Sequence, residues 1–232
     1  MKTRNPDNPF PRLPPGAGFR MNTSGDRLKK WKAMTGVFES GLRPDSFEEA
    51  YALCKDVCGQ YEREARSIWE FLRAHPQITQ IAEVGRNLGG NVFLMACAAK
   101  ALQRFVSFDL LEWSLTDRAI LGWMQRHGIA CEVRVANSLS YSPQTEDMFD
   151  FVYIDGGHGG LAIRADIQNW KDRTRFIGFH DYADKGRNRH RRCFPELVTA
   201  ITEAKEMHGW QVAWPRGNSE IIFDTGDQQR HL

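Results

Sequence analysis

The sequence has little that would direct it into a membrane or an oxidising compartment. Its longest uninterrupted apolar run, residues 92–99, is far shorter than the stretch of about 20 residues that a membrane-spanning helix needs. Residues 1–20 are polar and rich in proline, and they lack the apolar segment of a secretory signal peptide. We therefore expect a cytoplasmic protein that does not enter a membrane.

Cysteine is also scarce, and the charges nearly balance. The five cysteines are an odd number without the spacing of a paired metal-binding motif. Cys54 and Cys58 would share one face of a helix, but nothing near them completes a zinc site, so we expect reduced, packed thiols. The formal net charge of +2 gives no general argument for binding nucleic acid or membranes.

The 232 residues, 41% of them hydrophobic, suit one globular domain with an extra segment. Half of the 10 prolines lie within the first fifteen residues, where they exclude a regular helix or a central strand. We predict an N-terminal arm over residues 1–45 and one folded domain over residues 46–232. The basic residues around Trp31 are interpreted as part of a solvated arm, and a lid over a substrate is the alternative.

The folded domain is predicted to begin with a helix and to continue as alternating strands and helices. Ser46 and Glu49 fit a capping box, and apolar residues at helical spacing extend the helix as far as Pro76. We predict strands at residues 78–84, 105–108, 131–135, 149–154, 175–179, 211–214 and 220–223, and helices at 91–102, 117–127, 161–170 and 195–208. The alternation predicts a doubly wound, mostly parallel seven-stranded α/β sheet that ends in an antiparallel hairpin.

A glycine-rich turn, EVGRNLGGN, follows the first predicted strand and leads into a helix. Gly85 and Gly89 allow the backbone to turn sharply, and the helix beyond presents free N–H groups that suit a carboxylate or phosphate. The spacing is neither that of a dinucleotide-binding turn nor that of a Walker loop. A tight turn without a ligand is the alternative.

Polar residues follow the next two strands. Asp109 stands at the end of the second strand, where a carboxylate can accept hydrogen bonds from a ribose. Asn137 and Ser138 follow the third strand and could contact the edge of an adenine. A loop cap at Asp109 and an ordinary polar turn at residues 137–138 are the alternatives.

The ends of the fourth and fifth strands each present an aspartate and a histidine. The fourth strand runs into Asp155 and His158, separated by two glycines, and the fifth runs into His180 and Asp181. Carboxylates suit Mg²⁺, Ca²⁺ or Mn²⁺, whereas imidazole shifts the preference towards transition metals. A histidine of near-neutral pKa can also accept a proton from a hydroxyl. Hydrogen-bonded surface histidines are the alternative.

Residues 78–224, with EVGRNLGGN, IDGGH and HDY as their motifs, resemble the class I methyltransferases that use S-adenosylmethionine (SAM). The most similar branch is the metal-dependent group of macrolide-sugar and aminocoumarin-sugar O-methyltransferases and cephalosporin hydroxylase-like proteins. The resemblance implies a Rossmann-like fold and a transferase that methylates a hydroxyl of a small molecule or sugar. It assigns the methionine part of SAM to Glu83, Gly85, Gly89 and Asn91, the ribose to Asp109, the adenine to Asn137 and Ser138, a divalent cation such as magnesium to Asp155, His180 and Asp181, and the general base to His158.

Two residues depart from this pattern. His180 stands where the family often has a carboxylate, and Gly157 stands where other members carry the base. Two rival functions therefore stay open. One is a SAM-independent, metal-dependent hydroxylase or hydrolase on the same fold, and the other is a non-catalytic SAM-binding or docking module.

The acceptor and the partners are the least determined features of the sequence. Residues 185–192 carry five cationic side chains beside the predicted site. They could clamp an anionic acceptor, such as a nucleotide-sugar, a phosphorylated glycan or RNA, or form a solvated loop. A homo-oligomer also stays open.

Overall fold

A seven-stranded sheet forms the centre of the protein. The computed structural model describes residues 25–182, 194–214 and 220–226. The strand order is β3-β2-β1-β4-β5-β7-β6, with β1 to β5 parallel and β7 antiparallel to both of its neighbours. The strands are β1 (Gln80–Val84), β2 (Arg104–Asp109), β3 (Ala130–Val135), β4 (Phe149–Ile154), β5 (Thr174–Phe179), β6 (Gln211–Trp214) and β7 (Ile221–Asp224). The predicted sheet and its closing antiparallel hairpin are confirmed.

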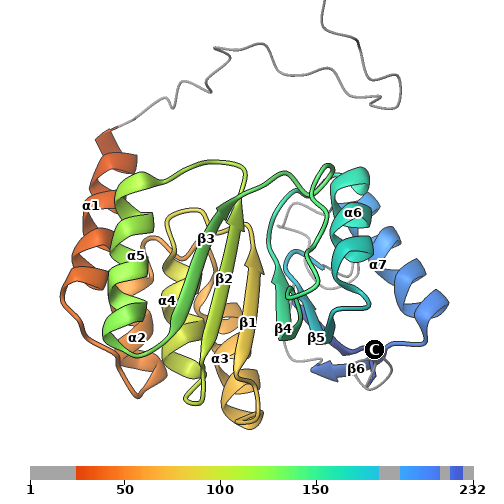
Figure 1. Ribbon diagram of the computed structural model, residues 1–232, viewed down its shortest axis with the longest axis horizontal. Coiled ribbons are helices and arrows are strands. Elements are labelled where there is room, and N and C mark those ends of the chain that lie inside the picture. The colour runs from red at the N-terminus through yellow and green to blue at the C-terminus, as the bar shows by residue number, and fades with distance from the viewer. Residues whose placement is uncertain (1–24, 183–193, 215–219, 227–232) are drawn as a thin grey trace, which may run out of the picture.

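Helices cover both faces of this sheet. Two separate hydrophobic cores result, one between the sheet and α1 to α5, the other between the sheet and α6 and α7. Figure 1 shows α1 beside α5 at one end of the molecule, and α6 beside α7 at the other. The helices are α1 (Gly25–Glu39), α2 (Phe47–Cys54), α3 (Glu62–Ala74), α4 (Gly90–Ala98), α5 (Ser114–Arg126), α6 (Gly160–Trp170) and α7 (Pro195–His208). The central strands β1 and β4 are buried along most of their length because both of their faces are covered, and β4 is apolar except for Asp150.

The single long helix predicted between Ser46 and Pro76 is wrong, because the chain forms two helices there. Ser46 does cap the first of them, α2, by accepting a hydrogen bond from the backbone N–H of Glu49 at 3.3 Å. Gly59 then takes a φ of +74°, and a second capping box at Tyr61 begins α3. The break lets the turn between the helices pack against the start of α4, where a Cβ on Gly90 would lie 2.5 Å from the Cα of Cys58.

The sequence analysis missed α1, which covers part of the segment interpreted as a solvated arm. Met34 and Phe38 are fully buried. Phe38 packs edge-on against Phe93 and Trp123, and its carbonyl oxygen accepts a hydrogen bond from Arg126 Nη2 at 2.6 Å. The domain boundary at residue 45 stays a prediction. The proline-rich residues 1–15 and the basic residues 185–192 lie outside the described residues.

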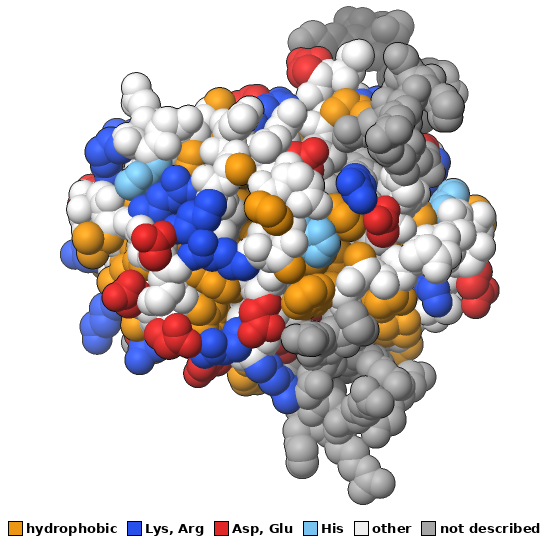
Figure 2. All heavy atoms as spheres, turned by 90° about the horizontal axis from the view of Figure 1, so that it is seen from below, with side chains coloured by type: hydrophobic (Ala, Val, Ile, Leu, Met, Phe, Trp, Pro, Cys, Tyr) orange, Lys and Arg blue, Asp and Glu red, His pale blue; other side chains and the backbone are white. Residues whose placement is uncertain are grey.

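The surface and the thiols are ordinary for a globular protein. Basic and acidic side chains lie close together on the face drawn in Figure 2, with exposed apolar side chains between them. The four cysteines in the described part of the chain are free, and three of them are buried. Within the same ranges, the helices are too short or too polar to span a bilayer.

Candidate functional site

The candidate site lies at the point where the strand order of the sheet reverses, between β1 and β4. From β1 the chain builds outward to β2 and β3 on one side and to β4 and β5 on the other. A crevice forms beyond the carboxyl ends of the strands at such a point, and ligands of open α/β sheets bind there. The turn after β1 and the residues after β4 and β5 therefore border the place where a ligand is expected.

Gly85 brings the turn after β1 into direct contact with the end of β4. Its φ is +100°, and a Cβ at this position would lie 2.1 Å from the carbonyl oxygen of Asp155. The backbone N–H of Asp155 donates to the carbonyl of Val84 at 2.8 Å. Only glycine permits such a close approach of two backbones at this φ. The predicted glycine-rich turn is therefore also the support of a predicted cation ligand.

Asp109 holds the other side of this turn. Its Oδ2 accepts a hydrogen bond from the backbone N–H of Asn87 at 2.7 Å, and its Oδ1 accepts one from the N–H of Leu111 at 2.9 Å. Asn87 has a φ of 49°, a left-handed conformation that the Asp109 bond helps to maintain. Asp109 thus ties the end of β2 to the glycine-rich turn, which is the loop-cap role that stood as the alternative to a ribose ligand.

Arg86 is a structural anchor that the sequence analysis missed. Its guanidinium is buried and forms an ion pair with Asp117, with 3.0 Å between Nε and Oδ1. It also donates to the carbonyl of Ser107 at 3.3 Å. The arginine joins the turn after β1 to β2 and α5. A charged residue in a polar turn reads as solvated in the sequence, so its burial could be recognised only from the fold.

Glu83 and Asn91 lie beneath the turn rather than at its surface. Glu83 is fully buried, and it accepts a hydrogen bond from the Ser107 hydroxyl at 3.3 Å. Burial, with the nearby charge of Asp155, raises the pKa of Glu83 to about 8. The side chain of Asn91 lies beside this carboxyl and lowers the pKa of Glu83. The two residues support the loop from below and do not line an open surface.

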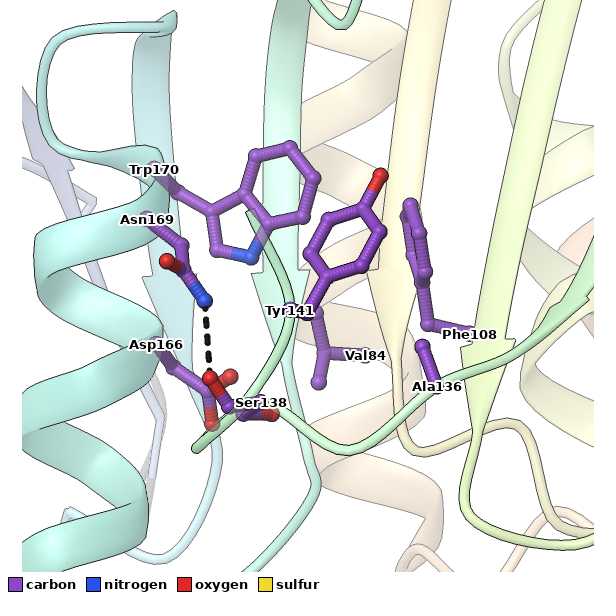
Figure 3. Close-up of a pocket in the computed structure, with 8 residues that line it drawn as sticks. All are labelled: Val84, Phe108, Ala136, Ser138, Tyr141, Asp166, Asn169 and Trp170. Carbon is purple, nitrogen blue, oxygen red and sulfur yellow. Dashed lines mark hydrogen bonds between the residues drawn. The ribbon is translucent and has the colours of Figure 1, made fainter. Parts of the chain in front are cut away.

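Asn137 and Ser138 belong to a polar turn that packs against α6. The Asn137 side chain accepts a hydrogen bond from the N–H of Leu139 at 3.0 Å, which makes it part of a polar turn. Ser138 lines a small pocket against α6, and its carbonyl oxygen accepts a hydrogen bond from Asn169 at 3.1 Å (Figure 3). The pocket is lined by Val84, Phe108, Ala136, Ser138, Tyr141, Asp166, Asn169 and Trp170, and its free volume of about 10 Å³ is the room of one water molecule.

Asp166 is the buried carboxyl group of this pocket. Its side chain is 1% exposed and lies next to Ser138 in Figure 3. Burial raises the pKa of Asp166 to about 7, although the hydroxyl of Ser138 lowers it somewhat. The carboxyl is therefore neutral in mildly acidic solution and gains its charge near neutral pH.

A prediction follows for the pH dependence of folding. Because burial raises the pKa of Asp166 to about 7 in the folded protein, above the usual aspartate value of about 4, ionisation favours unfolding as the pH rises from about 4 to 7. The neutral, nearly isosteric substitution Asp166→Asn should raise the free energy of unfolding at pH 8 by about 1 kcal/mol or more, and much less at pH 5. Urea denaturation at both pH values measures the difference. An equal change at pH 5 and pH 8 would contradict this account of Asp166.

The residues after β4 and β5 converge as predicted. His180 Nδ1 lies 3.0 Å from Asp155 Oδ1 and 3.3 Å from Asp181 Oδ2. His158 Nδ1 lies 3.1 Å from the same Asp181 oxygen. Asp155, His180 and Asp181 each offer one ligand atom within 4.8 Å of the other two. Their carboxylate and imidazole donors suit a divalent cation, so the residues fit the predicted cation site.

The charges in this cluster support one another. Burial lowers the pKa of His180, but hydrogen bonds to Asp155, Asp181 and Glu64 outweigh burial and raise it to about 12. Burial raises the pKa of Asp181, but the hydrogen bond and charge of His180 together with the charge of His158 leave this pKa below its usual value. Asp181 also has a φ of 60°, a strained backbone conformation for a residue with a side chain. Strain of this kind is common at functional sites.

Behind His180 lies a buried polar network that the sequence analysis missed. Glu64 Oε2 is 3.6 Å from His180 Nε2. The hydroxyl of Tyr153 donates to Glu220 Oε1 at 3.0 Å and accepts from Gln60 Nε2 at 2.9 Å. Burial raises the pKa of Glu220 well above its usual value, which favours a neutral carboxyl there. The one signal in the sequence was Glu64 at the third position after Tyr61, the spacing of a capping box, and it does not indicate a contact with His180.

His158 occupies a half-exposed position beside α7. Its ring stacks on Phe194, with centroids 4.3 Å apart and an interplanar angle of 16°. Glu196, in the first turn of α7, accepts a hydrogen bond from the N–H of Gly160 at 2.8 Å and so holds the segment after His158 against that helix. With Asp181 at Nδ1 and Phe194 on its face, the imidazole is oriented, and within the described residues its Nε2 makes no hydrogen bond.

The comparisons with known proteins point to one fold. No protein-family model matches the chain, and no curated protein matches it either. Among solved structures it is similar to cofactor-bound Rv0187 from MTB, with 16% identity and a TM-score of 0.52 over 89% of this chain and 92% of that chain. It is also similar to the O-methyltransferase TomG from Streptomyces achromogenes in complex with SAM, with 15% identity and a TM-score of 0.51 over 85% and 98% of the two chains. CalS11, a TDP-rhamnose 3'-O-methyltransferase of calicheamicin biosynthesis, matches with 12% identity and a TM-score of 0.51 over 88% and 96%.

At these identities the likeness shows the fold, which is the Rossmann-like methyltransferase fold that the sequence predicted. The similarity extends over most of each chain.

Proposed function

We propose that the protein is a SAM-dependent O-methyltransferase that acts on a hydroxyl group of a small molecule or sugar. The observation that carries this proposal is the contact of Gly85 with Asp155, which joins the glycine-rich turn to the cluster of aspartates and histidines. One strand end then binds the methyl donor while the next binds the acceptor. The Rossmann-like methyltransferase fold of the chain supports this reading.

The donor side consists of the turn after β1 and the end of β2. The turn that Gly85 and Gly89 form would lie against the methionine part of SAM, and the first turn of α4 would offer N–H groups to its carboxylate. Asp109 keeps further lone pairs for the ribose hydroxyls besides the two backbone bonds that it accepts. Glu83 and Asn91 support the turn, and Asn137 and Ser138 border the adenine side.

The acceptor side consists of the residues after β4 and β5. Asp155, His180 and Asp181 would hold a divalent cation, which when bound supplies positive charge that lowers the pKa of an acceptor hydroxyl. His158 accepts the hydroxyl proton at Nε2, and Asp181 stabilises the imidazolium that forms. The acceptor oxygen forms a bond to the methyl carbon while the bond from that carbon to sulfur breaks. S-adenosylhomocysteine and the methyl ether are the products.

The geometry favours an acceptor with two neighbouring hydroxyl groups. Two neighbouring hydroxyls would place one oxygen near His158 and a second near Asp155 and Asp181, as in a sugar or another vicinal diol. CalS11 is named as an enzyme that acts on TDP-rhamnose, so a nucleotide-sugar is one acceptor to include. An anionic or nucleic-acid acceptor and a homo-oligomeric state stay predictions.

Transfer of a labelled methyl group tests this function. The full-length protein is incubated with SAM that carries a deuterated methyl group and with a panel of sugars, nucleotide-sugars and catechols. We expect one acceptor class to gain the deuterated methyl group, detected by mass spectrometry. Conversion of an acceptor in the absence of SAM would instead favour the hydroxylase or hydrolase reading.

A further inference from the structure

His180 lies at the centre of the proposed cation site. Its Nδ1 atom lies 3.0 Å from Asp155 Oδ1 and 3.3 Å from Asp181 Oδ2. Two ligands that are bound at about 2.1 Å in adjacent positions of an octahedral shell are about 3.0 Å apart. The spacing in this cluster therefore matches adjacent ligands of one ion, and it makes Nδ1 the nitrogen ligand.

The other nitrogen of the His180 ring faces a third carboxylate. Nε2 lies 3.6 Å from Oε2 of Glu64, which is buried on α3. The Glu64 carboxylate is itself fixed, because its Oε2 accepts a hydrogen bond from the backbone N–H of Tyr61 at 3.0 Å. Histidines that bind metals commonly direct their second ring nitrogen at such a carboxylate, which sets the tautomer and the orientation of the ring.

The two contacts of the ring have one joint consequence. Nδ1 lies against Asp155 and Asp181, so a cation bound by these carboxylates would replace the proton at Nδ1, while Glu64 would face the proton that stays on Nε2. Magnesium strongly prefers oxygen ligands and keeps several waters, whereas imidazole suits iron, nickel, copper and zinc. The His180 nitrogen should therefore shift the preference of the site away from magnesium.

We propose that the site selects a transition-metal ion through Nδ1 of His180, and that Glu64 is the positioning residue that directs this nitrogen. The inference deepens the proposed function and rests on its metal-assisted part. It replaces magnesium, which the two aspartates led us to expect, with an ion that accepts nitrogen. The break between α2 and α3 also contributes to the site, because the capping box that begins α3 holds Glu64 in place.

The first test measures metal preference with Co²⁺ and Mg²⁺ as probes. The full-length protein is titrated with each ion by calorimetry, and the visible absorption of bound Co²⁺ reports its ligands. We expect Co²⁺ to bind more tightly than Mg²⁺ and to show an absorption band of nitrogen and oxygen ligation. Transition metals bind most sites more tightly than magnesium does, so the ratio must be compared with that of a matched variant.

That variant is His180→Asp, which replaces the nitrogen donor with a carboxylate. We expect the ratio of the Co²⁺ and Mg²⁺ affinities to fall by about tenfold or more, with a changed Co²⁺ band. An unchanged ratio overturns the selectivity. The wild-type Co²⁺ spectrum needs no variant, and the absence of a band at millimolar Co²⁺ overturns the proposal even if His180→Asp does not fold.

The second test addresses Glu64. We expect Glu64→Gln to weaken Co²⁺ binding by about 10–100-fold and to shift the Co²⁺ band, because the ring loses the partner of Nε2. Glu62→Gln is the matched control, since Glu62 is an exposed residue of the same helix that pairs with Arg66. A Glu64→Gln protein that is folded and binds Co²⁺ with unchanged affinity and spectrum overturns the positioning role.

Binding of SAM to the same preparations separates this inference from the proposed function. Wild-type protein that binds SAM but not Co²⁺ overturns the inference and leaves the transferase intact. If wild-type protein binds Co²⁺ selectively and His180→Asp loses this selectivity, the metal site is supported. If the same wild-type protein does not bind SAM, the transferase is overturned instead.

Discussion

Replacing Gly85 with alanine is expected to destabilise the protein by about 3 kcal/mol or more and to abolish binding of SAM. Two costs add in this variant. The alanine must adopt a φ of +100°, and its Cβ would lie 2.1 Å from the carbonyl oxygen of Asp155. The Cβ is attached directly to the backbone and the oxygen that it meets is a backbone atom, so neither can move without displacing β1 from β4. Urea denaturation and a SAM titration measure the two effects.

A second glycine provides the control for Gly85→Ala. Gly36 lies within α1, and a Cβ there would have no atom within 4 Å. Gly36→Ala should therefore stabilise the protein by about 0.5–1 kcal/mol, as is usual for this change inside a helix. A Gly85→Ala protein as stable as the wild type, with SAM affinity intact, would show that β1 and β4 do not meet as described.

Replacing His158 with alanine is expected to lower the turnover number by roughly 10²–10⁴ while the affinity for SAM stays nearly unchanged. In the proposed mechanism the half-exposed imidazole is the base, oriented by Asp181 at 3.1 Å and by the stacked ring of Phe194. It follows β4, on the proposed acceptor side, and is not among the residues proposed to bind the donor. Steady-state kinetics with the acceptor found by labelled methyl transfer measure the effect.

The kinetics of His158→Ala also distinguish a base from a packing residue. If His158 is the general base, the turnover number should fall at low pH as the imidazole is protonated. Replacing His158 should then remove this acidic limb of the pH–rate profile. His208→Ala, at the far end of α7, serves as a control that removes an imidazole elsewhere. Full turnover in His158→Ala would rule out the base assignment and require another group to accept the hydroxyl proton.

The sheet could be predicted because each of its strands carries its own signal. Residues 149–154 are apolar enough to form a strand buried on both faces, and the structure places β4 at those residues. The break between α2 and α3 could not be predicted in this way, because the apolar spacing continues on both sides of it. It depends on the packing of the turn near Cys58 against Gly90, a contact between segments far apart in the chain.

The part of the site that directly follows the strands could also be predicted from the sequence, whereas the residues that support it could not. Asp155, His158, His180 and Asp181 were predicted because strands end directly before them, and parallel strands end at one edge of a sheet. Glu64 and Arg86 were missed because a charged residue in a sequence reads as solvated. Only the fold shows that Glu64 lies against His180 and that Arg86 pairs with Asp117.

The central claim is that this fold binds SAM, and calorimetric titration of the purified protein with SAM and with S-adenosylhomocysteine tests it most directly. The account predicts micromolar binding of both, in the presence and in the absence of added metal ion, because the donor side is built from the turn after β1 and from Asp109. Binding of neither compound would contradict the account and leave the SAM-independent metalloenzyme or the docking module as the function of this protein.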